Sequence, residues 1–394
     1  MVDTQTTPPV VASDDHAGIA ALLPALAAGA AAADRNRCVN RDLASALRDL
    51  GAHRLLQPAA YGGAEASVVD HVRAVAAVAE GCVAAGWCVA VWSVHNWMLA
   101  HFDADTQAAV WGHDGAAMVS GSIAPKTPFR NDGDDHLLVE GRFGFTSGVD
   151  HADWVLVGGT VERDGRRMGA MIVAPRAQVE IDQASWQVMA LRGTGSKDLV
   201  IDQPLRIARR AAFFPDDSYA HAASGQAVNT APLYRAPYRG VSILVLAPPA
   251  LGAAKAALAR FLERLDGHTM MMARTTQRLD AAARLRVVES AADIDAAERT
   301  LYGAAQVCDE LGRCGERDAL REAAVARDAA YAVRLCARAV DRLFEAAGGS
   351  ALAETEPLQR LWRDVHGARM HAVLTWDGVA SVYADLLLGP VPKD

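Results

Sequence analysis

The chain has 394 residues, of which 51% are hydrophobic and 22% charged, which indicates a globular protein with more than one domain. Its formal net charge is −8, and its basic residues are interleaved with acids and alanines, so we expect no nucleic-acid partner. Six scattered cysteines form no C-x-x-C pair, so we expect no metal site, and reduced thiols in a cytoplasmic protein.

Residues 1–118 are predicted to form a helical domain that follows a polar tail. The N-terminus lacks the basic segment of a secretory signal. Apolar residues recur at helical spacing, as in Leu43, Ala46, Leu47 and Leu50. No apolar run approaches the roughly 18–20 residues that a membrane span requires. We therefore expect no membrane partner.

The pattern changes near Val119, where short runs rich in β-branched and aromatic residues begin. Gly and Asp turns separate these runs, and no helical pattern lies between them; the clearest are 137–145, 154–161 and 168–174. This order predicts an antiparallel sheet or barrel instead of a βαβ nucleotide fold. With a proline-containing bridge, the β domain is expected to cover residues 119–235.

Residues 236–394 are predicted to be helical again. The expected helices are 239–265, 268–313, 317–347 and 357–387, with a break at Gly348-Gly349. The predicted order is therefore helices, a small β domain, and a bundle of long helices.

One segment suggests a ligand more strongly than the others. Trp186 is followed by Gly193-Thr194-Gly195-Ser196. Glycines let a backbone come close to a flat polar ligand, and the two hydroxyl groups can bond to its edge. These four residues alone describe an ordinary turn at least as well.

Several other stretches share a distinctive order and spacing with this segment. They are Tyr61–Gly63, Ala85–Trp87 with His95, Val119–Pro125, Phe145–Trp154, Gly348-Gly349, Arg360–His366 and His371. Together they resemble the acyl-CoA dehydrogenase fold superfamily and, within it, the two-component flavin-dependent monooxygenases often called group D.

The resemblance covers nearly the whole chain and implies a mainly α fold with a central β domain. That fold has an N-terminal helical domain, a β-barrel and a C-terminal four-helix bundle. The resemblance also implies a homotetramer assembled through the bundle, with the flavin between the β domain and the bundle.

Two reactions are compatible with this fold. In one branch of the dehydrogenases, a glutamate base follows a tyrosine shortly after an Arg-Asp pair; counted from Arg363-Asp364, these positions hold His371 and Ala372. Alanine cannot accept a proton, and the only nearby acid is Asp377. An acyl-CoA dehydrogenase or oxidase is the alternative to a monooxygenase, and a non-enzymatic flavin-binding protein is a third hypothesis.

A monooxygenase of this family would need residues that protect a C4a-hydroperoxyflavin, which forms from reduced flavin and O₂. A dry pocket and a few placed hydrogen bonds do this. Ser122 and Ser147 stand where the family places such serines, and His95 and His371 match its histidines. Taken without the resemblance, Ser122 could end a strand, Ser147 could form a turn, and His95 could be a core residue.

The resemblance also implies how cofactor and substrate are held. The expected flavin-binding residues are Ser122, Ser147, Trp186, Thr194, Gly195, Ser196 and Arg274. The chain has no G-x-G-x-x-G and no P-loop, so reduced FMN or FAD would come from a separate NAD(P)H:flavin reductase. The expected substrate is a small aromatic or heteroaromatic molecule, because the candidate pocket residues are apolar or aromatic: Trp92, Trp97, Met98, Val373 and Trp376.

Overall fold

The N-terminal part is built from helices, and one of them is enclosed on every side. The computed structural model describes residues 17–163, 165–267, 269–270, 275–277 and 280–389. Every residue of α4 is buried, and this helix packs against α3, α8 and β1. The helices are α1 (Ala17–Asn36), α2 (Arg41–Asp49), α3 (Val68–Gly81), α4 (Val83–Leu99) and α5 (Ala104–Trp111).

The strands form two main sheets that share one apolar core. The first has the order β1-β4-β5 and the second β2-β3-β7-β6. The strands are β1 (Val119–Pro128), β2 (Arg130–Asp132), β3 (His136–Thr146), β4 (Trp154–Arg163), β5 (Arg166–Pro175), β6 (Glu180–Asp182) and β7 (Lys197–Ala208). Side chains of β3, β4, β5 and β7 meet between the sheets, as Phe143, Val157, Ile172 and Leu199 do.

The pairing of β1 with β4 differs from the antiparallel prediction. These strands are parallel, whereas the other pairs in the two sheets are antiparallel. The reason is the path of the chain: β2 and β3 lie between β1 and β4 in sequence but belong to the other sheet. The chain therefore crosses to that sheet and returns in its original direction.

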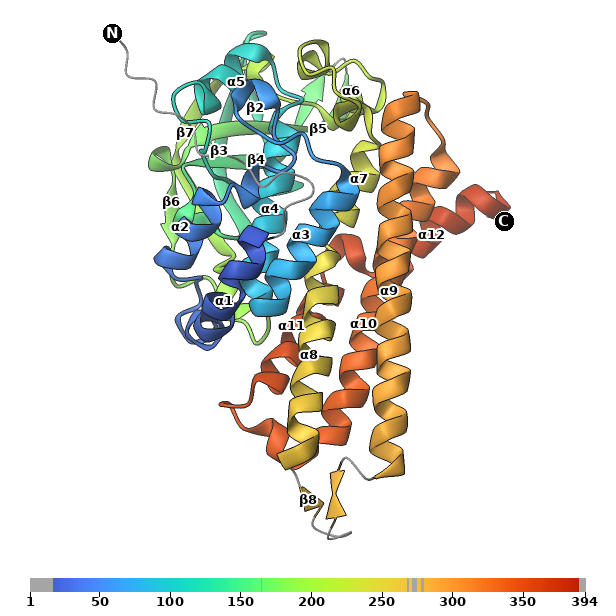
Figure 1. The fold of residues 1–394 in the computed structure, drawn as a ribbon. Coiled ribbons are helices and arrows are strands. Elements are labelled where there is room, and N and C mark those ends of the chain that lie inside the picture. Colours follow the sequence, from blue (N-terminus) through green and yellow to red (C-terminus); the bar gives the residue numbers. More distant parts are fainter. Residues whose placement is uncertain (1–16, 164, 268, 271–274, 278–279, 390–394) are drawn as a thin grey trace, which may run out of the picture.

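The C-terminal part is a bundle of long helices that extends away from the sheets (Figure 1). A bridge with α6 (Pro215–Tyr219) leads into it. The helices α8, α9, α10 and α11 pack on one another, while α12 leaves the bundle beside α10. The elements are α7 (Tyr238–Leu244), α8 (Pro248–Gly267), β8 (Thr269–Met270), β9 (Thr275–Thr276), α9 (Ala281–Cys314), α10 (Ala319–Ala347), α11 (Pro357–Arg369) and α12 (Trp376–Leu388).

The helix–sheet–helix order is confirmed, but three of the predicted helix limits are wrong. The predicted helix 239–265 is two helices, since Pro248 starts a new one. The predicted helix 268–313 starts only at Ala281, where the Asp280 side chain accepts a hydrogen bond from the Ala283 N–H. The predicted helix 357–387 is interrupted between α11 and α12, and His371 lies in this interruption.

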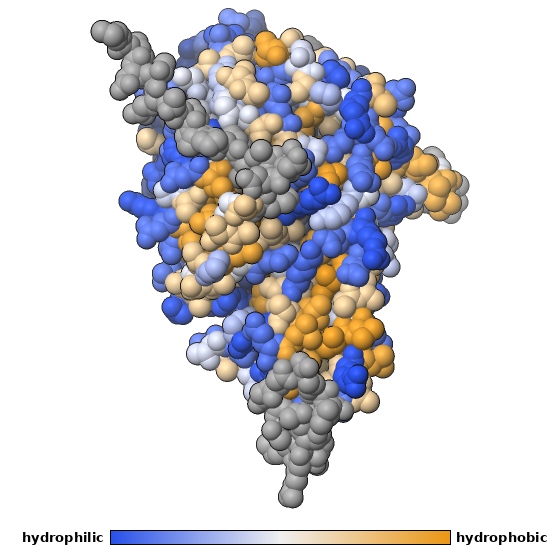
Figure 2. Space-filling view, in the orientation of Figure 1, coloured by the Kyte–Doolittle hydropathy of each residue, from blue (hydrophilic) through white to orange (hydrophobic). Residues whose placement is uncertain are grey.

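Two helical segments are long and apolar enough to cross a membrane by length and composition, contrary to the sequence expectation. They are Ala17–Asn36 and Tyr238–Leu265. The second is 78% buried inside the protein, which is typical of a core helix. Apolar side chains are exposed elsewhere, over part of the bundle and on α12, where Figure 2 shows hydrophobic surface; they include Leu285, Val288, Leu387 and Leu388.

Buried histidines should make the protein sensitive to acid. Burial lowers the pKa of His53 and His71 to about 3 and that of His95 and His101 to about 4. Below pH 6.5 the unfolded chain binds protons at these sites while the folded chain does not. The free energy of unfolding therefore decreases as the pH is lowered. At pH 5.5 the combined loss is about 5 kcal/mol, a large part of an ordinary domain's stability.

The melting temperature, measured from pH 8 to pH 5, should therefore fall steeply below pH 6.5. Replacing the buried His71 by Gln should flatten this fall, whereas the same change at the exposed His113 should not. A melting temperature that stays constant down to pH 5 would contradict the prediction.

Candidate functional site

The helix α4 carries Trp87 and His95 two turns apart on one side, about 12 Å along its axis. Trp87 is buried, and its indole N–H donates a hydrogen bond to Ser147 Oγ at 3.1 Å. Ser147 follows the end of β3. The helix is thereby joined to the β domain through a buried polar contact.

A line of hydroxyl groups continues from this contact. Ser147 Oγ lies 2.7 Å from Ser196 Oγ, which lies 2.6 Å from Thr194 Oγ1, and Thr194 donates to the Leu191 carbonyl at 2.8 Å. We call Ser147, Ser196 and Thr194 the hydroxyl relay. Because Thr194 has only one hydroxyl hydrogen, Ser196 must donate to Thr194, and Ser147 must donate to Ser196. Each relay oxygen keeps one lone pair, so it can still accept a hydrogen bond from a ligand.

His371 lies at the start of this line. Its ring centroid is 5.5 Å from that of Trp87, and its Nδ1 is buried without a hydrogen-bond partner among the described residues. Burial lowers the pKa of His371, so the ring is neutral at physiological pH. A neutral imidazole with an unused nitrogen can accept a proton.

His95 and Ser122 have their own contacts. His95 Nδ1 lies 3.2 Å from the Val119 carbonyl, which can only accept, so Nδ1 carries the proton and Nε2 keeps its lone pair. Burial lowers the pKa of His95 to about 4. Ser122 Oγ donates to the Gly144 carbonyl at 2.6 Å and thus connects β1 with β3. Neither residue has a described hydrogen bond to the hydroxyl relay.

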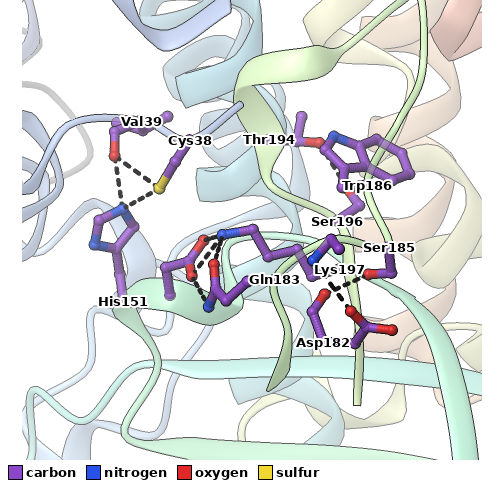
Figure 3. Close-up of polar contacts among 12 residues, drawn as sticks. Cys38, Val39, His151, Asp182, Gln183, Ser185, Trp186, Thr194, Ser196 and Lys197 are labelled. Atoms are coloured by element: carbon purple, nitrogen blue, oxygen red, sulfur yellow. Dashed lines mark hydrogen bonds and ion pairs between the residues drawn. The ribbon is translucent and has the colours of Figure 1, made fainter. Parts of the chain in front are cut away.

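Trp186 begins the stretch 186–196 that carries Thr194 and Ser196, which we call the relay segment. The Trp186 N–H donates to the Arg192 carbonyl at 3.0 Å (Figure 3). Its ring meets Phe145 edge-on, with centroids 5.9 Å apart. Phe145 is 72% exposed and has a φ of +63°. This backbone conformation is unusual for an aromatic residue, and such strain gathers at functional sites. The residue pattern placed Phe145 in a matching stretch but gave no sign of its exposure or its φ.

The glycines of this segment lie against neighbouring parts of the chain. A Cβ atom on Gly193 would lie 2.9 Å from the Cβ of Ala84, and one on Gly195 would lie 3.0 Å from the Arg37 carbonyl oxygen. Gly195 also has a φ of +55°. Both glycines therefore allow the segment to pack closely against other parts of the protein.

Behind the relay, a buried ion pair holds the segment in place (Figure 3). Lys197 Nζ donates to Asp150 Oδ2 at 2.7 Å and to Gln183 Oε1 at 2.5 Å. Cys38 Sγ lies 3.4 Å from His151 Nε2. Burial and the Asp150 carboxylate raise the pKa of Cys38 to about 12, so this cysteine is a thiol and not a nucleophilic thiolate.

The candidate substrate residues differ in burial: Trp97 and Met98 belong to one core cluster, against which Val373 and Trp376 pack, and Trp92 belongs to a second cluster. Trp92, Trp97 and Met98 are buried in the core, and the two indole N–H groups donate to Ser120 Oγ and to the Leu233 carbonyl. Trp376 packs against α10, with Arg334 4.9 Å above its ring. Val373, half-buried, lies two residues after His371. The remaining predicted residue, Arg274, lies outside the described residues.

A glycine beside the relay should tolerate no side chain. Gly148 has a φ of +70°, and a Cβ there would lie 2.6 Å from Trp92 Nε1. We expect Gly148→Ala to lower the free energy of unfolding by about 3 kcal/mol, from backbone strain plus overpacking. The matched control is Gly133→Ala, because Gly133 has a φ of +64° and nothing within 4 Å.

Urea unfolding of the two variants separates these effects. In the control, the free energy of unfolding should fall only by the cost of backbone strain, about 1 kcal/mol. Equal losses in the two variants would mean that the Trp92 ring moves aside without cost.

The positions where one branch of the dehydrogenases carries its catalytic base hold no buried carboxylate in this protein. Ala372 and Asp377 are both exposed. The buried carboxylate nearest to them in the sequence, Asp364, accepts the Leu191 N–H at 2.6 Å. The geometry thus offers a line of hydroxyl groups, and Trp87 connects this line to the neutral imidazole of His371.

Comparisons with known proteins agree with this picture. Residues 23–117 and 244–376 match the families described as acyl-CoA dehydrogenase N-terminal and C-terminal domain. The chain is 35% identical to the HsaA oxygenase subunit of a flavin-dependent monooxygenase from Mycobacterium tuberculosis, over 96% of both chains. It is 30% identical to the oxygenase component of an FADH₂-dependent resorcinol hydroxylase from Rhizobium sp., over 89% of this chain and 88% of the relative. The crystal structure of 3-HSA hydroxylase from Rhodococcus sp. RHA1 superposes with a TM-score of 0.88 at 33% identity, covering 96% and 97% of the two chains.

Proposed function

Because the chain belongs to the flavin-dependent monooxygenases built on the acyl-CoA dehydrogenase fold, we propose that it is the oxygenase component of a two-component system. It would receive reduced FMN or FAD from a separate NAD(P)H:flavin reductase. With O₂, and through a C4a-hydroperoxyflavin, it would hydroxylate a small aromatic or heteroaromatic molecule. The names of the resorcinol and p-hydroxyphenylacetate hydroxylases among its relatives support an aromatic substrate.

The observation that carries this proposal is the buried hydroxyl relay, which bonds to Trp87, the ring that His371 contacts. Ser147, Thr194 and Ser196 are 6%, 1% and 4% exposed, so water has little access to them. Reduced flavin, when bound, would supply two electrons to O₂. Its ring N–H groups are donors, which suit the free lone pairs of the relay oxygens.

His371 would then accept the proton that the substrate releases, since its ring is neutral and Nδ1 has no described partner. His95 is a second neutral imidazole on the same side of α4 as Trp87. We propose that it lies at the substrate end of the site, together with Ser122. Dehydrogenation is disfavoured, because neither Ala372 nor Asp377 offers a buried carboxylate base.

We also propose a homotetramer in the cytoplasm. Exposed apolar side chains on the bundle and on α12 would be covered by neighbouring copies, among them Leu285, Val288, Leu387 and Leu388. All six cysteines are free thiols, which fits a reducing compartment.

The test supplies the protein with chemically reduced FMN or FAD, oxygenated buffer, and a panel of phenols and heteroaromatic compounds. We expect a hydroxylated product and, without substrate, release of H₂O₂ that is slower than from free reduced flavin. If instead an acyl-CoA bleaches the oxidised flavin and no hydroxylated product forms, the proposed function is wrong.

A further inference from the structure

The turn that carries Thr194 is held from the C-terminal bundle. Leu191, just before this turn, has a φ of +50°, an unfavourable conformation for a leucine. Its carbonyl accepts the Thr194 hydroxyl at 2.8 Å and the Thr194 N–H at 3.1 Å. The orientation of Leu191 therefore decides where the hydroxyl relay ends and in which direction its protons point.

The contact that holds Leu191 comes from α11, far along the sequence. Asp364 Oδ1 accepts the Leu191 N–H at 2.6 Å, and the neighbouring Arg363 donates to the Met189 carbonyl. A Cβ atom on Gly367 would lie 2.8 Å from the Cβ of Ala190, so the helix packs closely on this segment. The helix α11 thus contacts three successive residues, 189–191.

We propose that Asp364 is a positioning residue of the oxygenase site. This inference rests on the proposed function. The Asp364 carboxylate holds the Leu191 N–H, Leu191 orients Thr194, and Thr194 sets the direction of hydrogen bonding through Ser196 to Ser147. The same stretch of chain, seven residues later, carries His371. Asp364 therefore sets the relay in register with the proposed proton acceptor.

The chemistry of this carboxylate supports a role in positioning. Asp364 is 4% exposed, and burial raises its pKa to about 6. The neighbouring guanidinium of Arg363 pairs with Asp34 at 3.1 Å. The contact with Leu191 needs an acceptor oxygen but not a charge, so an amide of the same shape should replace it.

The test compares Asp364→Ala with Asp364→Asn. After mixing protein-bound reduced FMN with O₂, Asp364→Ala should release H₂O₂ about tenfold faster than the unaltered protein, the size expected for one lost hydrogen bond. Hydrogen exchange of the peptide covering residues 186–196 should also accelerate. Asp364→Asn should stay within about twofold of the unaltered protein in both measurements.

Asp341→Ala is the control for a general disturbance of α11. Asp341 accepts hydrogen bonds from Trp362 at 2.7 Å and His366 at 2.8 Å, both on α11, but it does not touch the relay segment. Should Asp364→Ala not fold, Thr194→Val removes the next link without touching α11 and should give the same fast release.

The proposal is overturned if Asp364→Ala retains normal H₂O₂ release, if Asp341→Ala reproduces its effect, or if Thr194→Val behaves normally. A failure of the proposed function looks different. In that case the unaltered protein releases H₂O₂ as fast as free flavin, and hydrogen exchange of 186–196 still decides whether Asp364 holds the segment.

Discussion

Replacing Ser147 by alanine should accelerate H₂O₂ release from protein-bound reduced flavin by about 10- to 100-fold, the range that corresponds to the loss of one buried hydrogen bond. The change removes the first member of the hydroxyl relay and leaves the buried Trp87 N–H without its acceptor. Ser196 also loses its donor. The rate is measured by a coupled peroxidase assay after reduced FMN, bound to the protein, is mixed with O₂.

A second buried Trp–Ser pair on α4 provides the matched control. Trp92 donates to Ser120 Oγ at 3.1 Å, the same length as the Trp87–Ser147 contact, but Ser120 takes no part in the relay. Ser120→Ala should cost a similar 1–3 kcal/mol of stability, roughly the penalty of an unsatisfied buried N–H, and leave H₂O₂ release unchanged. If both variants accelerate release equally, the effect comes from loosening of α4 and not from the relay.

Replacing His371 by asparagine should lower the rate of product formation by about 10²- to 10⁴-fold, the usual contribution of a placed general base. Asparagine is smaller and cannot accept a proton at neutral pH. In the unaltered protein, burial lowers the pKa of His371, so the neutral form persists above pH 6.5 and activity should be level there. Activity should fall only as pH drops below 6.5, and the variant should lack this dependence.

His366 on α11 serves as the comparison residue. It bonds to Asp341 and packs against Trp362, with ring centroids 4.7 Å apart and the rings tilted. His366→Asn should therefore reduce stability more than turnover. Melting temperatures recorded at each pH separate titration of His371 from acid unfolding. If His371→Asn forms product at a rate within threefold of the unaltered protein, His371 is not the proton acceptor.

The arrangement of the relay could be predicted in part, because it depends on short motifs. The resemblance implies that Ser147, Thr194 and Ser196 bind the flavin, and in the structure Ser147 bonds to Ser196, which bonds to Thr194. The parallel pairing of β1 with β4 was not predictable from local patterns, since it depends on which sheet accepts the intervening hairpin. The conformation of Phe145 is likewise set by its tertiary surroundings.

The candidate substrate residues show what residue types alone leave open. Trp92, Trp97 and Met98 stand on an apolar helix, and an apolar helix can line a pocket or fill a core with the same sequence. In this protein α4 is covered on all sides, so these residues became core. Trp87, on the same helix, bonds to the hydroxyl relay, because its neighbour across the interface is a serine.

The enclosure of α4 has a consequence for synthesis on the ribosome. Part of its cover is α8, which begins at Pro248, whereas α4 ends at Leu99. At the usual rate of translation, roughly 10–30 s pass between the emergence of the two helices. During that time the apolar surface of α4 is not yet covered by α8. The nascent chain should therefore depend on chaperones, and a pause in translation before residue 248 should promote aggregation more than a pause after 267.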